Sequence, residues 1–143
     1  MSSIKRISYV IVFVRDMQRA IAFYRDAVGL PVRAESEHWT EFDLDGTLLA
    51  LHLATGLPPA PAPLADPAQK VGVAQEVVFH ADDPFAVRAS LMARGVVVAA
   101  PKLVHDAGPT MVGVSCLFED VDGNVLSVYG IVERSAYDAA LRE

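Results

Sequence analysis

The sequence predicts an α+β fold made of two tandem βαβββ modules. Three observations predict it: the chain contains an internal repeat, both copies show the same order of strand and helix patterns, and each copy has an Asp-Gly turn between apolar runs. Hydrophobic residues make up 52% of the 143 residues, which is enough for a buried core at this length. We expect a single domain with module one at about 4–54, a proline-rich connector at 55–72, module two at about 73–132, and a short C-terminal tail.

The internal repeat has an offset of 66 residues. Asp16 and Gly29 bracket a helical pattern, and Asp82 and Gly95 bracket its counterpart at the same separation of 13 residues. The identities at this offset are Val12/Val78, Phe13/Phe79, Asp16/Asp82, Ala20/Ala86, Gly29/Gly95 and Val32/Val98. Because they fall at corresponding points of one pattern, they indicate a duplicated strand-helix unit.

Module one begins with a strand at 7–14, which is rich in β-branched and aromatic residues. A helix follows, with Asp16 as its N-cap and Gly29 as its stop. Three further strands are predicted at 32–37, 39–44 and 47–53. Asp45 and Gly46 separate the last two strands, and an Asp-Gly pair between apolar runs is a strong hairpin signal.

Module two repeats this plan with a strand at 76–81, a helix at 84–94, and strands at 96–99, 112–119 and 125–129. Pro84 behind two aspartates is a common way to begin a helix. The second module is longer than the first, and we expect the extra residues at 101–111 to form a loop over one end of the sheet. Residues 135–141 are predicted to form a short helix.

The charge and cysteine content exclude several classes of function. The net charge of −6 makes nucleic acid and anionic membrane surfaces poor partners. The single cysteine, Cys116, excludes an internal disulfide framework and favours a reducing, cytoplasmic location, and we interpret it as a core residue. The longest early apolar run, residues 9–14, is far too short to span a bilayer.

The hairpin register predicts where His52 lies. If Leu44 and Thr47 flank the turn, His52 pairs with Trp39, and Glu41 pairs with Ala50. These four residues then share one face, and the opposite face, which packs on the helix, consists of Phe42, Leu49 and Leu51. We expect the first face to line a cavity where His52 contacts a ligand or a metal. The alternative is a histidine that is satisfied by a neighbouring carboxylate or carbonyl group.

Glu76 begins an apolar strand and shares a face with Val78 and His80. A buried carboxylate is costly without a partner, so we interpret Glu76 as a metal ligand or general base, with a solvated strand-edge residue as the alternative. Tyr9 either hydrogen-bonds a ligand or is a half-buried aromatic residue of the sheet. No chemical role is assigned to His38, His80 or His105.

These modules resemble the vicinal oxygen chelate superfamily, which includes glyoxalase I, extradiol dioxygenases and bleomycin-resistance proteins. The resemblance is carried by residues 7–16, Phe23-Tyr24, Gly29-Leu30 and the segment 118–124 (Phe-Glu-Asp-Val-Asp-Gly-Asn). It implies the glyoxalase-like fold, in which the modules form a curved, partly closed sheet around a cavity. It also implies a homodimer.

In the resembling enzymes, the first and last strands of each module present ligands to one metal ion. The corresponding residues here are Tyr9, His52, Glu76 and Ser127, of which only His52 and Glu76 are clearly competent to bind a metal. The resemblance therefore implies one divalent ion (Zn, Ni, Mn or Fe) on His52 and Glu76, or none. We expect all four residues to converge on one cavity, with Trp39 in its wall.

Two functions follow from the resemblance. The first is a glyoxalase- or dioxygenase-like protein that binds a small molecule in the cavity between the modules. It would act as a metal-dependent lyase or dioxygenase that stabilises an enolate or oxyanion, with His52 and Glu76 as catalytic residues. The alternative is a metal-free protein of the bleomycin-resistance type that sequesters its ligand. Tyr9, Trp39, Glu41 and Ser127 are predicted to contact the ligand, and the acidic groups favour a cationic or aromatic one.

Overall fold

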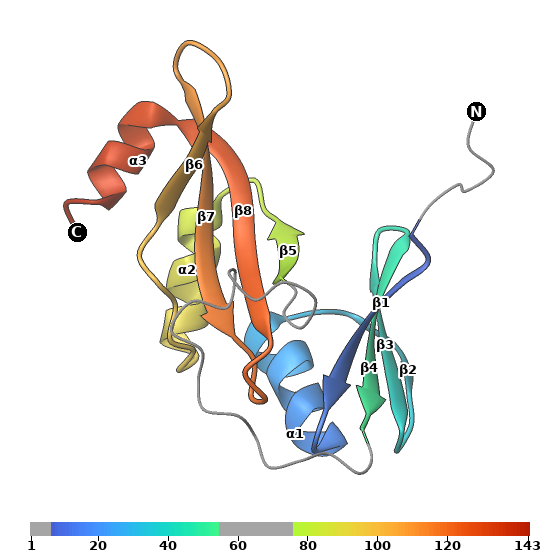
Figure 1. The fold of residues 1–143 in the computed structure, drawn as a ribbon. Coiled ribbons are helices and arrows are strands. Elements are labelled where there is room, and N and C mark those ends of the chain that lie inside the picture. Colours follow the sequence, from blue (N-terminus) through green and yellow to red (C-terminus); the bar gives the residue numbers. More distant parts are fainter. Residues whose placement is uncertain (1–6, 55–75) are drawn as a thin grey trace, which may run out of the picture. The chain divides into compact units, whose positions relative to one another are not determined.

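A computed structural model of the chain describes residues 7–54 and 76–143. The chain divides into two compact units, Met1–Ala62 and Pro63–Glu143, and each contains a four-stranded mixed sheet with helices (Figure 1). This arrangement confirms the α+β class and the two βαβββ-like modules. The predicted connector at 55–72 lies outside the described residues, and the assignment of both modules to one domain stays a prediction.

The first unit contains the predicted strand-helix-strand-strand-strand order. Its elements are β1 (Tyr9–Val14), α1 (Met17–Ile21), the π-helix η1 (Ala22–Val28), β2 (Val32–Glu35), β3 (Trp39–Leu44) and β4 (Thr47–Leu53). The strand order in the sheet is β1-β4-β3-β2, with β1 parallel to β4 and the other neighbours antiparallel. The sequence predicted one continuous helix, and the structure shows that its second half has wider π-type turns.

Local signals in the first unit act as predicted. The carboxylate of Asp16 accepts a hydrogen bond from the backbone N–H of Arg19 at 3.1 Å, which makes it the N-cap of α1. Gly29 ends the helix with a φ of 87°, a conformation that glycine adopts at little cost. Asp45 and Gly46 both have positive φ angles, 53° and 97°, which is typical of the type I′ turn of a two-residue hairpin.

The helix covers one face of the first sheet. Alternate residues of β1 point to this face, so Val12 and Val14 are buried. The helix contributes Met17, Ala20, Ile21 and Tyr24 to the same core. The ring of Tyr24 lies 5.9 Å from the ring of Phe42 on β3, measured between centroids. Among the described residues of the first unit, no helix covers the other face of the sheet, which carries Tyr9, Trp39, Glu41 and His52.

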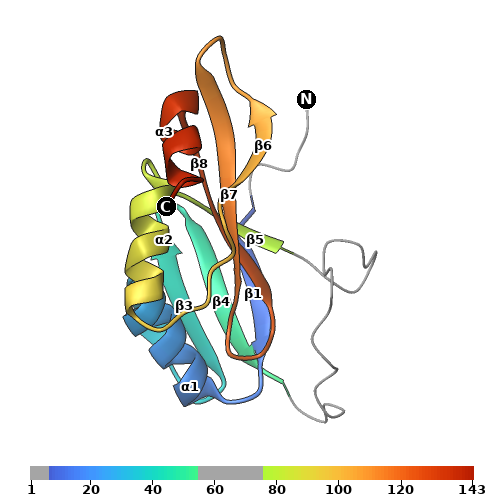
Figure 2. The same ribbon diagram turned by 90° about the vertical axis from the view of Figure 1, so that its left-hand side faces the viewer.

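The second unit has the order β5 (Glu76–His80), α2 (Pro84–Ala93), β6 (Lys102–Asp106), β7 (Met111–Glu119), β8 (Val125–Glu133) and α3 (Arg134–Ala140). Its sheet has the strand order β5-β8-β7-β6, and β5 runs parallel to β8. Figure 2 shows α2 and α3 on the same side of this sheet. None of the helices in the described part of the chain is both long and apolar enough to cross a membrane.

The structure corrects the predictions for residues 96–99 and 101–111 of module two. The expected strand at 96–99 contains only a single bridge, between Val98 and Phe118, whereas the edge strand β6 lies at Lys102–Asp106, inside the expected loop. Pro101 has no N–H to donate, so pairing along β7 is interrupted there and resumes beyond it. Pairing resumes because β7 and β8 form a longer hairpin than the sequence predicted, reaching Met111 and Glu133.

The predicted start of α2 at Pro84 is confirmed. Its N-cap is Asp83, the second of the two aspartates that precede Pro84. The Asp83 carboxylate accepts hydrogen bonds from the N–H groups of Phe85 and Ala86 at 3.1 and 3.0 Å. Pro84 favours this start because its ring already has the φ of the first helical residue.

The segment 118–124, which carried the family resemblance, has a structural role. Asp120 is 7% exposed, and its Oδ1 accepts hydrogen bonds from the N–H groups of Asp122 and Asn124, both at 2.8 Å. Its Oδ2 accepts another from the side-chain amide of Asn124 at 2.7 Å. Gly123 has a φ of 82°. The motif therefore closes the turn between β7 and β8.

The core of the second unit lies between α2 and the sheet. Leu91 of α2 is buried, as are Cys116 on β7 and Val128 on β8. Gly130 on β8 allows the chain after β5 to pass close by, because the N–H of Ala81 donates to the carbonyl of Tyr129 at 2.8 Å. A Cβ atom at position 130 would overlap the carbonyl oxygen of Ala81 and lie 2.9 Å from Cδ of Pro84.

We expect Gly130→Ala to lower the free energy of unfolding by about 1–3 kcal/mol, because the added methyl group meets backbone that cannot yield easily. Urea denaturation followed by circular dichroism measures this change. Ile131→Val, at the exposed neighbouring position, is the matched control and should shift stability by less than about 0.5 kcal/mol. Equal stability of the two variants would contradict the close approach at Gly130.

Each sheet ends in edge strands, β1 and β2 in the first unit and β5 and β6 in the second. Unpaired edges favour pairing with another copy, and we keep the prediction of a homodimer. Light scattering coupled to size-exclusion chromatography should give about twice the chain mass of 15.4 kDa at micromolar concentration. A mass that stays at that of one chain would contradict it.

Candidate functional site

The uncovered face of the first sheet, which we call the open face, carries large apolar side chains. On β1, Tyr9 is 50% exposed, Ile11 44% and Phe13 59%. The register pairs them with Leu48, Ala50 and His52 of β4. Isolated exposed apolar residues are ordinary, but three in alternation on one strand form a patch that is typical of a binding surface.

An aromatic cluster, Tyr9, Phe13, Trp39 and His52, lies on this face. His52 pairs with Trp39 across β4 and β3, as the hairpin register predicted. The Trp39 ring lies edge-on to Tyr9 at 6.1 Å and to His52 at 5.7 Å, measured between centroids, and Phe13 lies 5.5 Å from His52. The sequence reasoning missed Phe13, although its parity with Tyr9 on the predicted strand could have indicated it.

His52 is held in one tautomer by its own backbone neighbour. Its Nδ1 lies 2.9 Å from the carbonyl oxygen of Leu53, and a carbonyl only accepts hydrogen bonds, so Nδ1 carries the proton. In the neutral ring the lone pair is then on Nε2, which can accept a hydrogen bond or bind one metal ion. The side chain is exposed, so a ligand can reach it.

Glu41 is engaged by its neighbours. Its Oε1 accepts a hydrogen bond from the indole N–H of Trp39 at 3.0 Å, and its Oε2 lies 3.7 Å from Nε of Arg33. Only 16% of the Glu41 side chain is exposed. These contacts orient the Trp39 ring and balance much of the carboxylate charge. Arg33 was missed from the sequence because its partner is set by the irregular pairing of β2 with β3.

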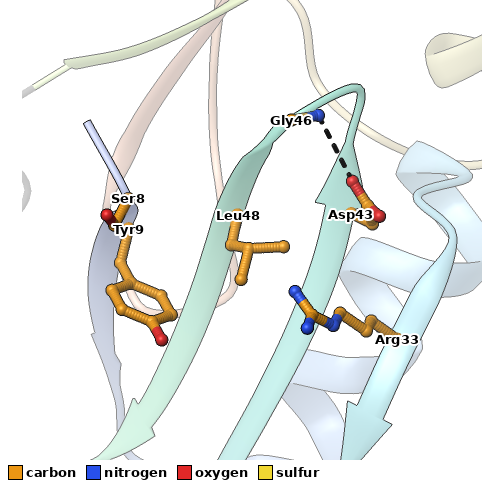
Figure 3. Close-up of a pocket in the computed structure, with 6 residues that line it drawn as sticks. All are labelled: Ser8, Tyr9, Arg33, Asp43, Gly46 and Leu48. Carbon is orange, nitrogen blue, oxygen red and sulfur yellow. Dashed lines mark hydrogen bonds between the residues drawn. The ribbon is translucent and has the colours of Figure 1, made fainter. Parts of the chain in front are cut away.

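A pocket of about 360 Å³ lies at the other end of the open face (Figure 3). It is lined by Ser8, Tyr9, Arg33, Asp43, Gly46 and Leu48. The view shows the Tyr9 ring, the Leu48 side chain and the Arg33 guanidinium group around a common space. Tyr9 is the only predicted site residue here. Arg33 and Asp43 add opposite charges, and the hairpin register would have placed Asp43 on this face, two residues after Glu41.

Glu76 and Ser127 lie in the second unit. Glu76 is exposed at the start of β5, and Ser127 is fully buried on β8. Ser127 pairs with Val78, which is two residues after Glu76, so the two predicted residues share a face. The Ser127 hydroxyl has no hydrogen-bond partner within residues 7–54 and 76–143.

The donors within each unit do not fit the three- or four-ligand metal site of the resembling enzymes. Tyr9 pairs with Leu48, whereas His52 pairs with Phe13 four positions further along β1, so aromatic rings rather than donor atoms flank the imidazole. In the second unit, Ser127 offers a neutral hydroxyl where a divalent ion prefers a charged ligand. Within the described residues of either unit, no three His, Cys, Asp or Glu side chains form a group that could hold a metal ion.

Cys116 has the structural role that the sequence indicated. It is fully buried in the core of the second unit, and this burial raises the pKa of its thiol above the ordinary value. A thiol that stays protonated and inaccessible is a poor nucleophile, so we place Cys116 outside the site.

Solved structures with the same fold include one described as a binding protein and one described as a lyase. TnmS3, an antibiotic binding protein from Streptomyces sp. CB03234, is 24% identical, with a TM-score of 0.66, and the match covers 92% of this chain and 100% of that one. A glyoxalase/bleomycin resistance protein from the same strain is 26% identical, with a TM-score of 0.60 and coverage of 86% and 98%. A lactoylglutathione lyase from Agrobacterium tumefaciens is 22% identical, with a TM-score of 0.63 and coverage of 87% and 92%.

No curated protein matches the chain in sequence. However, most of the length of this chain does match a protein family. Residues 6–128, which include both sheets up to the middle of β8, match the family described as the Glyoxalase/Bleomycin resistance protein/Dioxygenase superfamily. This match agrees with the fold and with the residues that first suggested the resemblance. The chain belongs to that superfamily.

Proposed function

We propose that this protein binds a small, planar aromatic molecule on the open face of the first sheet. The observation that carries the proposal is the exposure of Tyr9 and Phe13, which are half or more exposed although they alternate with buried valines. Keeping large rings in water is unfavourable, and a ligand that covers them recovers that free energy.

The arrangement of the rings suits an aromatic ligand. Trp39 is nearly perpendicular to both Tyr9 and His52, with interplanar angles of 77° and 86°. Such rings offer both faces and edges to a further ring, and each favourable aromatic contact contributes about 0.5–1.5 kcal/mol beyond the buried area.

Polar groups around the cluster would orient the ligand. Nε2 of His52 can accept a hydrogen bond, and the pocket at the opposite end offers the guanidinium group of Arg33 and the carboxylate of Asp43. A molecule with both a donor and an acceptor group at one end suits this pair. Glu41 is already engaged by Trp39 and Arg33, which favours an aromatic ligand over the cationic one that the charge had suggested.

The comparisons support binding in a general way. One structure with this fold is described as an antibiotic binding protein, and we extend small-molecule binding to this chain as part of the proposal.

The second candidate function is that of a metal-dependent lyase or dioxygenase with His52 and Glu76 as metal ligands and catalytic residues. It is favoured by Nε2 of His52, which has a lone pair for a metal ion in the neutral ring, and by a fold neighbour that is described as a lyase.

The neutral dye N-phenyl-1-naphthylamine tests the binding proposal. It fluoresces when bound to apolar surfaces, and it should quench Trp39, the only tryptophan of the chain, by energy transfer. Tyr9→Ala and Phe13→Ala should each weaken the affinity for the dye about tenfold, which is about 1.4 kcal/mol, because each removes one ring of the aromatic cluster.

Val97→Ala is the matched control, because Val97 is an apolar residue of the second unit that is 89% exposed. Its affinity should equal that of the wild type, and all three variants should keep the wild-type circular dichroism spectrum. Wild-type affinity of Tyr9→Ala and Phe13→Ala would contradict binding on this face.

Metal content separates the two candidate functions. For protein purified without an affinity tag, we expect Mn, Fe, Co, Ni and Zn at well below one ion per chain, because the donors of each unit do not fit a three-ligand site. His52→Ala should then weaken dye binding and leave the fold intact. One ion per chain that is lost in both His52→Ala and Glu76→Gln would instead support the metal enzyme. It would also support the prediction that Tyr9, His52, Glu76 and Ser127 line one cavity.

A further inference from the structure

A second group of reactive side chains lies in the second unit and has no part in the proposed function. Nε2 of His105 on β6 lies 2.7 Å from the hydroxyl oxygen of Tyr129 on β8. Nδ1 of the same ring lies 2.8 Å from the carbonyl oxygen of Asp106. Both distances are those of good hydrogen bonds.

The two hydrogen bonds define which group donates and which accepts when the His105 ring is neutral. A carbonyl oxygen only accepts, so Nδ1 of His105 carries the proton and donates to Asp106. In the neutral ring Nε2 then has a lone pair, and the hydroxyl of Tyr129 donates to it. The phenol proton therefore already points at a base, and the lone pairs of the phenol oxygen remain available.

The sheet is shaped to hold the imidazole in this position. The pairing of β6 with β7 shifts between Leu103 and His105, which places His105 opposite Gly113. A Cβ atom at Gly113 would overlap the His105 ring, so glycine at this position makes room for it. The end of β6 is held by an ion pair, in which a guanidinium nitrogen of Arg134 lies 2.6 Å from a carboxylate oxygen of Asp106.

This geometry meets the requirements for an activated nucleophile: the nucleophile and a base lie within hydrogen-bond reach, and a third group orients the base. We propose that Tyr129 is a nucleophile towards activated acyl compounds, such as aryl esters, and that His105 is its general base. His105 is exposed and Tyr129 is half-buried, so a small acyl compound can reach the pair.

The step balances within the pair and its substrate. A lone pair of the Tyr129 oxygen forms a bond to the acyl carbon while the phenol proton moves to Nε2 of His105. The bond from the acyl carbon to the leaving oxygen then breaks, and that oxygen keeps the electron pair and takes up the proton from His105. The products are an acyl ester of Tyr129 and the free alcohol or phenol.

p-Nitrophenyl acetate is a suitable probe, with the acetylated residues identified by peptide mass spectrometry. Tyr137 is an internal reference, since it is also half-buried and its hydroxyl accepts a hydrogen bond from the N–H of Leu103 at 3.3 Å. Among the described residues, no histidine is hydrogen-bonded to this hydroxyl. We expect Tyr129 to be acetylated on the order of 100-fold faster than Tyr137, the lower end of what positioned proton transfer contributes.

Two variants test the role of His105. His105→Gln keeps a hydrogen-bond acceptor but has no basic nitrogen, and it should lower the rate at Tyr129 to about that of Tyr137 while the rate at Tyr137 stays unchanged. Gly113→Ala should have the same effect, because it displaces the imidazole without removing it. His80→Gln, an exposed histidine beside Tyr129 on β5, is the matched control and should leave both rates unchanged.

The proposal is overturned if Tyr129 is labelled no faster than Tyr137, or if His105→Gln labels Tyr129 as fast as the wild type does. Stable acetylation of His105 in place of Tyr129 would also overturn it, because the imidazole would then be the nucleophile. None of these outcomes depends on ligand binding at the aromatic cluster of the first unit.

Discussion

The packing of a helix against one face of each sheet is the constraint on which the rest of the structure depends. Side chains of a strand alternate between its two faces, so once Val12 and Val14 face the helix, Tyr9 and Phe13 must face away from it. If the register of β1 shifted by one residue, Tyr9 and Phe13 would be buried and Val12 and Val14 would be exposed. The composition of the open face is therefore a direct consequence of the core, and the site is built from the residues that the core does not use.

In each sheet, one face points away from the described helices of its own unit, and the positions on these two faces carry residues of different chemistry. In the first unit these positions hold aromatic rings, with Arg33 and Asp43 at one end, and this set favours binding of an aromatic molecule. In the second unit they hold Tyr129 and His105, whose hydrogen bonds already direct a proton from phenol to imidazole. Membership of the superfamily establishes the fold of both units but does not choose between binding and chemistry.

The departures from the family's metal-binding pattern have a consistent physical meaning. Ser127 is a neutral, fully buried hydroxyl, and His52 lies among the rings of Phe13 and Trp39. A metal ion needs several charged or strongly donating atoms that converge on one point, whereas an aromatic ligand needs exposed rings and a few polar groups. The first unit provides the exposed rings and the polar groups that an aromatic ligand needs, and all of these residues lie in one sheet.

The sequence by itself determined the module order, the helix cap at Asp16 and the pairing of His52 with Trp39, because each depends on signals a few residues apart. The sequence analysis misplaced β6. The interruption of pairing at Pro101 and the length of the β7–β8 hairpin both depend on contacts between strands, and no local pattern encodes these contacts. Only the tertiary structure decided that Arg33 lies beside Glu41 and that His105 meets Tyr129, 24 residues away. Both contacts follow register shifts between neighbouring strands, and such shifts are set by packing across the whole sheet.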